Sequence, residues 1–381
     1  MGKNSIGEID KDLTSADWKL RMECVKRMDW TPTHEQIERG LADDEWVVRC
    51  AWVRRMDWIP TQEQVERGLN DYDSGLRRMW VRREDWTPTS EQVEKGLNDR
   101  DSAVRLMWVN RMDWTPTIKQ VEMGMKDPDS WVRLTWVRRT DFTPTHSQIR
   151  DGLLDDDLYI RCAWITRTDW TATHEQVENG LLDNIDIRRA WVKRTDWTPT
   201  PEQVERGLKD EMWDVREAWV KRMDWTPTPE QVENGLKDEI WEIRKRWVER
   251  ADRKPTPEQI ERGLNDEYWG ARVAWVERMD WTPTSKQVEM GLKDYYSGAR
   301  LAWVKRTDWT PTPEQVESGF LDDDHDIRLA WIARQGIVAK EEQVERGLRD
   351  SSKDVRDAWM RRIMDEQGKL LEDENPHGAS L

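Results

Sequence analysis

Aromatic and acidic residues occur together in this chain, in short windows that return at a fixed spacing. The windows read DEWV at 44–47, YDSG at 72–75 and EYWG at 267–270, with further windows of the same kind between and beyond them. They hold all five tyrosines of the chain and five of its 27 tryptophans. Aromatic rings with carboxylates beside them bind cations and basic protein surfaces rather than making or breaking bonds. The windows therefore predict a binding surface.

We name this predicted surface the aromatic-acidic edge. Its candidate residues are Trp46, Tyr72, Trp131, Tyr159, Trp213, Asp214, Trp241, Glu242, Tyr268, Trp269, Tyr295 and Tyr296. The windows carry a net charge of -15, against -16 for the whole chain, so the acidity is concentrated there. Acidic residues in the first turn of a helix also complement its dipole. A purely structural role for these carboxylates is therefore the alternative interpretation.

The windows belong to a 28-residue repeat that occurs twelve times. The first copy opens with Asp29-Trp30-Thr31-Pro32-Thr33, and the last, degenerate copy begins at Gly336. We number each copy 1 to 28 from the Asp of Asp-Trp, which places the windows at positions 16–19. A fixed period of this length predicts a solenoid, in which each unit buries its apolar face against its neighbours.

Each copy predicts two short helices. Thr at position 5 and Gln at position 8 form a capping box, as in Thr200 and Gln203, so a first helix begins at position 6. Gly at position 12 occurs in every copy and predicts a close approach of a neighbouring helix or a tight helix end. Asp at position 15 is interpreted as the N-cap of a second helix, with positions 20, 24 and 28 facing the core.

Two rows of arginine, at positions 21 and 27, recur thirteen times each. A phosphate-binding ladder is one interpretation. The Asp residues at positions 15 and 1 match these arginines almost one for one, so we favour ion pairs within or between units. The Trp at position 24 is likewise predicted to lie in the core rather than to stack on nucleic-acid bases.

The expected fold is all-α, a right-handed α-solenoid of about twelve two-helix repeats with terminal caps. Residues 1–28 match the repeat in part and predict an N-terminal cap. Eleven tandem repeats are expected over 29–335 and a degenerate capping repeat over 336–363. Residues 364–381 are acidic, and we expect them to be disordered.

The order of Leu, Asp and Val-Arg in each unit, as in Leu208, Asp210, Val215 and Arg216, resembles HEAT-like repeats. It resembles still more closely the bacterial leucine-rich repeat variant proteins, in which a proline-bearing link joins short helices. The resemblance covers residues 12–363, and it implies an α-solenoid that binds macromolecules without implying a particular activity. The Trp at position 24 and the Asp-Trp link depart from both families.

Other chemistry has little support in the sequence. His34, His146 and His174 lie one or more units apart and are not expected to share a metal ion. The repeat background shows no catalytic grouping or phosphate-binding loop, so we expect neither an enzyme nor a cofactor. Three scattered cysteines fit no disulfide framework. Without a secretory signal or a membrane-spanning run, the expected location is the cytoplasm, with no membrane as a partner.

The sequence therefore predicts a non-enzymatic scaffold that engages a partner protein with a basic surface through the aromatic-acidic edge. The alternative is an inhibitor that imitates a nucleic acid and occupies a DNA- or RNA-binding protein. Direct binding of nucleic acid is not expected, because the net charge repels phosphates.

Overall fold

A computed structural model describes residues 6–250 and 252–373, and all regular secondary structure in this part of the chain is helical. The chain divides into two compact units, Met1–Asp196 and Trp197–Leu381. The first unit contains α1 (Ile6–Leu13), α2 (Trp18–Lys26), α3 (His34–Leu41), α4 (Trp46–Arg54), α5 (Gln62–Leu69), α6 (Ser74–Arg82), α7 (Ser90–Leu97), α8 (Ser102–Asn110), α9 (Ile118–Gly124), α10 (Ser130–Arg138), α11 (His146–Leu153), α12 (Leu158–Thr166), α13 (His174–Gly180) and α14 (Ile185–Lys193). The second unit contains α15 (Pro201–Leu208), α16 (Trp213–Lys221), α17 (Pro229–Gly235), α18 (Trp241–Glu249), α19 (Pro257–Leu264), α20 (Trp269–Glu277), α21 (Ser285–Gly291), α22 (Ser297–Lys305), α23 (Pro313–Phe320), α24 (His325–Ala333), α25 (Glu341–Gly347) and α26 (Lys353–Asp373).

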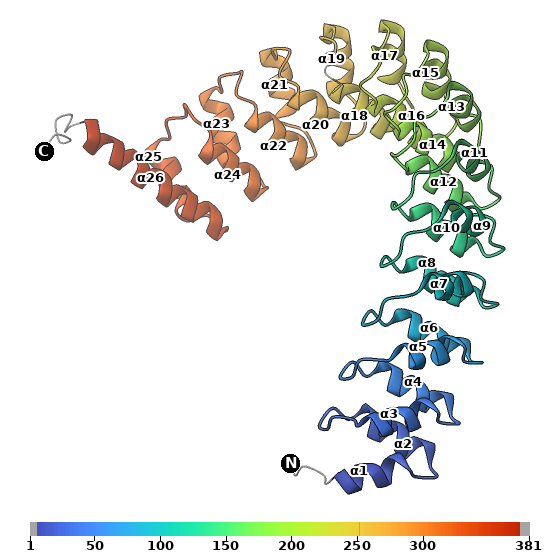
Figure 1. The fold of residues 1–381 in the computed structure, drawn as a ribbon. Helices are drawn as coiled ribbons and strands as arrows, with labels where there is room; N and C mark the ends of the chain where they lie inside the picture. The colour runs from blue at the N-terminus through green and yellow to red at the C-terminus, as the bar shows by residue number, and fades with distance from the viewer. Residues whose placement is uncertain (1–5, 251, 374–381) are drawn as a thin grey trace, which may run out of the picture. The chain divides into compact units, whose positions relative to one another are not determined.

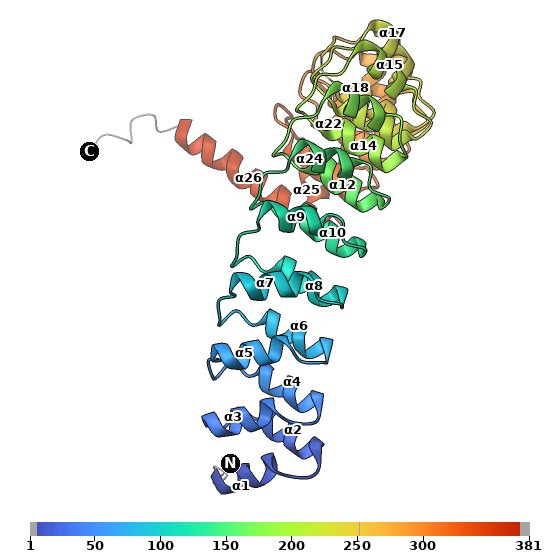
Figure 2. The same ribbon diagram turned by 45° about the vertical axis from the view of Figure 1, so that its right-hand side comes forward.

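Each repeat forms one pair of helices, so the prediction of an all-α solenoid of helix pairs is confirmed. Within each unit of the chain, the second helix of a pair packs on its own first helix and on the second helix of the next pair (Figures 1 and 2). Residues 1–28 contribute a pair of their own, α1 and α2. None of the described helices is long and apolar enough to cross a membrane.

The first helix begins where the sequence predicts it. In the first eleven copies the Thr at position 5 is the N-cap, and a capping box with the Gln at position 8 is present, as at Thr89 and Gln92. The backbone N–H groups of Thr89 and Gln92, two of the donors left unpaired at the start of a helix, are thereby satisfied. The box fixes position 6 as the first helical residue of every such copy.

The second helix differs from its prediction at both ends. Its N-cap is position 17, such as Asp101 of α8, and not the Asp at position 15. Asp99, at position 15, instead accepts a hydrogen bond from the backbone N–H of Asp101. It also forms an ion pair with Arg77 of the preceding repeat. The helix then ends at position 26, so position 28 lies in the link and is exposed, as at Met112. The core stripe is formed by positions 20, 24 and 25, represented by Val104, Trp108 and Val109, and the prediction for position 28 is wrong.

The tryptophan at position 24 is the centre of each repeat. Trp108 is 1% exposed, and its ring meets the link residue Trp86 edge-on with centroids 6.1 Å apart. Such edge-to-face pairs add to the free energy gained by burial of the rings themselves. The prediction that these tryptophans form the core is confirmed.

Both arginine rows are structural, as the ion-pair interpretation predicted. Arg77, at position 21, donates through Nε and Nη2 to both oxygens of Asp99 in the next repeat, each at 2.7 Å. Arg83, at position 27, pairs with Asp85 and donates to the backbone carbonyls of Val53 and Arg55 in the preceding repeat. Bidentate pairs of this kind fix the orientation of one repeat on the next.

The last helix is longer than expected. Helix α26 continues from Lys353 to Asp373, ten residues beyond Ile363, where the sequence predicted that the chain becomes disordered. Residues 364–373 are thus described as part of a helix, and the prediction of disorder stays a prediction. Residues 374–381 lie outside the described residues.

Candidate partner-binding surface

The aromatic-acidic edge follows the turn between the two helices of each repeat and the first turn of the second helix. Nine of its twelve predicted residues are exposed: Trp46, Tyr72, Trp131, Tyr159, Trp213, Tyr268, Trp269, Tyr295 and Tyr296. The other three, Asp214, Trp241 and Glu242, are half-buried. The informative feature is whether such exposed rings form a contiguous patch, because contiguous apolar patches are typical of interaction sites.

The exposed rings of the first unit, Met1–Asp196, are isolated from one another. Tyr72 is covered on one side by the guanidinium of Arg49, whose Cζ lies 5.2 Å from the ring centroid. Within the described residues, no ring pair joins Trp46, Tyr72, Trp131 or Tyr159. Single exposed aromatics are common on soluble proteins. The exposed rings in this part of the predicted edge therefore do not form a cluster.

In the second unit the rings of consecutive repeats meet. Trp241, at the start of α18, lies nearly parallel to Tyr268 with centroids 6.1 Å apart. Trp269, at the start of α20, lies in the same way on Tyr296, which in turn meets Tyr295 edge-on at 5.2 Å. Trp213, at the start of α16, occupies the same repeat position as Trp241 and Trp269, but none of these ring contacts includes it. We group it with them by its position, as a row along four successive second helices, α16, α18, α20 and α22. We call them the aromatic row.

Two glycines make room for this row. A Cβ atom on Gly270 would lie 2.6 Å from Cζ3 of Trp241, and one on Gly298 would lie 3.2 Å from Cζ3 of Trp269. Each indole therefore covers the first turn of the next second helix, at position 19. A larger residue at that position would displace the ring.

The aromatic row replaces the helix caps found in other repeats. In α6, α8, α10, α12 and α24 the N-cap is an Asp whose carboxylate accepts a backbone N–H. In α16, α18, α20 and α22 it is Met212, Ile240, Tyr268 or Tyr296, and no side-chain cap bond is made. Loss of a cap costs about 1 kcal/mol per helix. Four successive repeats lack this stabilisation; three of them have an exposed side chain at the N-cap, Met212, Tyr268 or Tyr296, whereas Ile240 is half-buried and packs against the core.

The sequence interpretation missed Met212 and Ile240, because it considered only aromatic and acidic residues in the windows. Met212 is exposed, and Ile240 is half-buried. The signal that could have identified them is the loss of a capping residue at position 17 in four consecutive copies. That signal needs the correct position of the N-cap, which the sequence placed two residues too early.

The acidic part of the edge has two different roles. Carboxylates at position 17, such as Asp101 and Asp129, cap helices and are structural, as the alternative interpretation held. Carboxylates at position 16 are highly exposed: the side chains of Glu239 and Glu267 retain 80% and 75% of their surface. Position 16 therefore supplies the solvent-facing acidity beside the aromatic row.

The arginines near the row are already paired. Arg216 binds Asp238 with both Nε and Nη2 at 2.9 Å, whereas its contact with Glu239 is 3.6 Å. Arg244 likewise binds Asp266 at 2.6 and 2.7 Å and reaches Glu267 only at 3.9 Å. Each guanidinium thus neutralises one Asp and contacts the position-16 Glu only at its edge. The surface beside the row keeps a negative charge.

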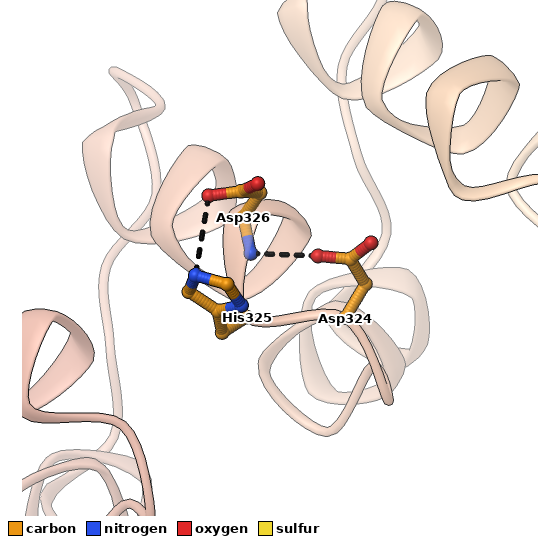
Figure 3. Close-up of side chains that lie close together, drawn as sticks. All are labelled: Asp324, His325 and Asp326. Atoms are coloured by element: carbon orange, nitrogen blue, oxygen red, sulfur yellow. Dashed lines mark hydrogen bonds and ion pairs between the residues drawn. The ribbon is translucent and has the colours of Figure 1, made fainter.

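One group of possible metal ligands comes together among the described residues. Asp324, His325 and Asp326 at the start of α24 place one ligand atom each within 4.8 Å of one another (Figure 3). Asp324 caps the helix by accepting the N–H of Asp326, and His325 Nε2 lies 3.5 Å from the Asp326 carboxylate. These contacts account for the grouping without an ion. The predicted separation of the other histidines holds, since His34, His146 and His174 are each exposed at the start of a different first helix.

The three cysteines lie in or near the core. Burial raises the pKa of the Cys50 thiol to about 11, and it also raises the pKa of the thiols of Cys24 and Cys162. All three are free thiols. A thiol with such a pKa is protonated near neutral pH and is a weak nucleophile.

No protein-family model matches the chain. No curated protein matches it either. Among solved structures, the chain is similar to a leucine-rich repeat variant described as having a novel repetitive structural motif, with 22% sequence identity and a TM-score of 0.43. The match covers 60% of this chain and 88% of that one. The chain's own helices establish the repeated array of helix pairs, and the solved structure that it is similar to is a leucine-rich repeat variant, the class that its sequence resembles.

Proposed function

We propose that the protein is a non-enzymatic scaffold that binds a partner protein with a basic surface. The aromatic row of the second unit and the exposed glutamates beside it form the contact. This refines the hypothesis drawn from the sequence, because the isolated rings of the first unit are not included. A reducing cytoplasm is the compartment we propose, since the three cysteines are free thiols.

The observation that carries the proposal is the exchange of helix caps for exposed apolar residues. A surface selected only for stability would keep Asp at position 17, as in α8 and α10. At that position α20 and α22 instead have Tyr268 and Tyr296, whose rings stack on Trp241 and Trp269, and α16 has the exposed Met212. Exposed residues that break a local stability rule are typical of functional surfaces.

The chemistry of the surface favours a basic protein. Rings and methionine supply the apolar anchors that dominate binding energy at protein interfaces. The exposed carboxylates of Glu239 and Glu267 repel a nucleic acid and attract a cationic surface. An inhibitor that imitates a nucleic acid would rely on the carboxylates rather than the rings, which makes the two hypotheses separable.

The experiment is affinity capture from cells that make the protein, with three forms of the full-length chain as bait. The first is the wild type. The second carries Trp213→Ala, Trp241→Ala, Tyr268→Ala and Trp269→Ala. The third is the matched control, in which the isolated rings of the first unit are replaced: Trp46→Ala, Tyr72→Ala, Trp131→Ala and Tyr159→Ala.

We expect a basic protein to be retained by the wild type and the control but lost from the row variant. Circular dichroism must first show that all three baits have the same helix content. Retention of the same proteins by all three baits would contradict the proposal. If duplex DNA competes for the captured protein and the row variant still binds it, the imitation of a nucleic acid is the correct function.

A further inference from the structure

We propose that the aromatic row binds an extended basic peptide that presents a Lys or Arg at every third residue. This inference rests on the proposed function and specifies the part of the partner that is recognised. It follows from the spacing of the row, from its charge and from the way the row ends.

The spacing of the row matches an extended chain. Trp213, Trp241 and Trp269 occupy the same repeat position on α16, α18 and α20, and each of these helices packs against the next. Packed helices lie about 8–10 Å apart. An extended or polyproline II peptide advances about 3.1–3.4 Å per residue, so three residues span about 9–10 Å. Steps of two or four residues would fall out of register within two repeats.

The chemistry of each step suits a long cationic side chain. Trp213 and Trp269 at position 18 are exposed and Trp241 is half-buried. The accessible part of each ring can pack against the aliphatic stem and attract the cation through its electron-rich face. The position-16 carboxylates of Glu239 and Glu267 lie in the turn just before Trp241 and Trp269. Because Arg216 and Arg244 are bound closely to Asp238 and Asp266, these glutamates remain able to pair with a cation from outside.

The row has a defined end, which sets the length of the peptide. In the next repeat, position 18 is Ser297 and position 16 is Tyr295. The pair of Tyr295 and Tyr296 closes the row with two rings that meet edge-on. Three tryptophan steps therefore accommodate a segment with cationic residues at i, i+3 and i+6.

The test is fluorescence anisotropy of labelled peptides with the full-length protein. Three peptides contain the same three lysines among the same alanine, serine and proline residues, with lysines at every third residue, at every second residue or contiguous. We expect the first to bind about tenfold more tightly than the other two, because misalignment removes about two exposed cation–ring contacts. The affinity should also fall with added salt.

Three variants of the protein test whether the aromatic row distinguishes between peptides with different lysine spacing. The variant with Trp213→Ala, Trp241→Ala and Trp269→Ala should bind all three peptides equally weakly. The variant with Glu239→Gln and Glu267→Gln leaves the rings in place and should bind the spaced peptide more weakly, with a smaller effect of salt. The control with Trp46→Ala and Trp131→Ala should bind like the wild type.

Failure of this inference differs from failure of the proposed function. Equal binding of the three peptides to the wild type, or no binding of any of them, would contradict the proposal that the row recognises a cation at every third residue. The proposed function would still stand if the captured partner required the row. If the partner is captured equally by the row variant, both proposals are wrong.

Discussion

A Cβ atom on Gly96 would lie 1.9 Å from Nε1 of Trp108, so the indole occupies the space that any other residue at position 96 would need. The same relationship holds between positions 12 and 24 in all twelve repeats, with distances of 1.9–2.2 Å to the indole nitrogen. Five of the first helices, α9, α13, α17, α21 and α25, end at this glycine, but its φ is not positive, so the close contact with the indole is what requires a glycine there. The glycine lets the first helix pack directly on the central tryptophan of its own repeat.

The first prediction concerns this contact. Gly96→Ala should destabilise the protein by about 1–3 kcal/mol, because the indole of Trp108 is buried and has no room to move. Alanine favours a helix more than glycine does, so helix propensity alone predicts the opposite sign. Urea unfolding followed by circular dichroism measures the difference. Lys95→Ala, on the exposed side of the same helix, is the control, and an unchanged or higher stability of Gly96→Ala would contradict the packing described here.

The second prediction concerns the ion pairs between repeats. Arg105→Ala removes the partner of Asp127, whose carboxylate is buried and accepts Nε and Nη2 at 2.7 and 2.6 Å. A buried carboxylate without its partner costs about 3–5 kcal/mol, and hydrogen exchange of α8 and α10 should show this as faster opening. The double variant Arg105→Met with Asp127→Asn removes both charges, keeps an acceptor for the backbone N–H of Asp129 and should recover most of the loss. If the double variant is as unstable as the single one, the pairing is not the source of the stability.

The third prediction concerns acid. Hydrogen bonds from Arg139 hold the pKa of Asp141 below its usual value, despite the opposing effect of burial. Arg55 does the same for Asp57, and Arg111 for Asp113. Because the folded pKa is the lower one, the stabilisation is complete above the unfolded value of about 3.9 and is lost as the pH falls through the folded value.

Stability should therefore be level from neutral pH to about pH 5 and decline below about pH 4. Asp141→Asn removes one titrating group. It should be less stable than the wild type at neutral pH but lose less stability in acid. Urea unfolding at a series of pH values tests this, and an identical decline in the two proteins would show that Asp141 takes no part in it.

The fourth prediction concerns the missing caps. Met212→Asp provides α16 with the side chain that caps α8, and it should stabilise the protein by about 1 kcal/mol. The reciprocal change, Asp101→Ala, should destabilise it by a similar amount. If the residue at position 212 serves binding, Met212→Asp should also weaken capture of the partner. A variant that is both more stable and equally able to bind would show that the exposed methionine has no function.

The sequence was a sufficient guide to those features that depend on neighbouring residues. The capping box of Thr89 and Gln92 is local, and the matching numbers of Arg and Asp indicated the ion pairs before any geometry was known. The predicted position of the second N-cap was wrong because an Asp can either cap a helix or stabilise the turn before it. Asp99 stabilises the turn by accepting a hydrogen bond from the backbone N–H of Asp101, a contact that only the structure shows.

The candidate surface was less predictable from the sequence. Exposed rings occur in both units of the chain, and their composition is similar. What separates them is contact between repeats: Trp241 meets Tyr268, whereas Trp131 meets no ring among the described residues. Such contacts depend on where each ring lies relative to the next helix, for which a glycine such as Gly270 is needed. Charge counting likewise did not separate the capping Asp129 from the exposed Glu239.

The most direct test of the central claim is site-specific photo-crosslinking of the full-length protein in cells that make it. A photoreactive phenylalanine analogue replaces Tyr268 of the aromatic row in one form and the isolated Tyr159 in another. We predict that the form labelled at Tyr268 crosslinks a basic protein and that the form labelled at Tyr159 does not. A partner that crosslinks at Tyr159 and not at Tyr268 would contradict the assignment of the row as the binding surface.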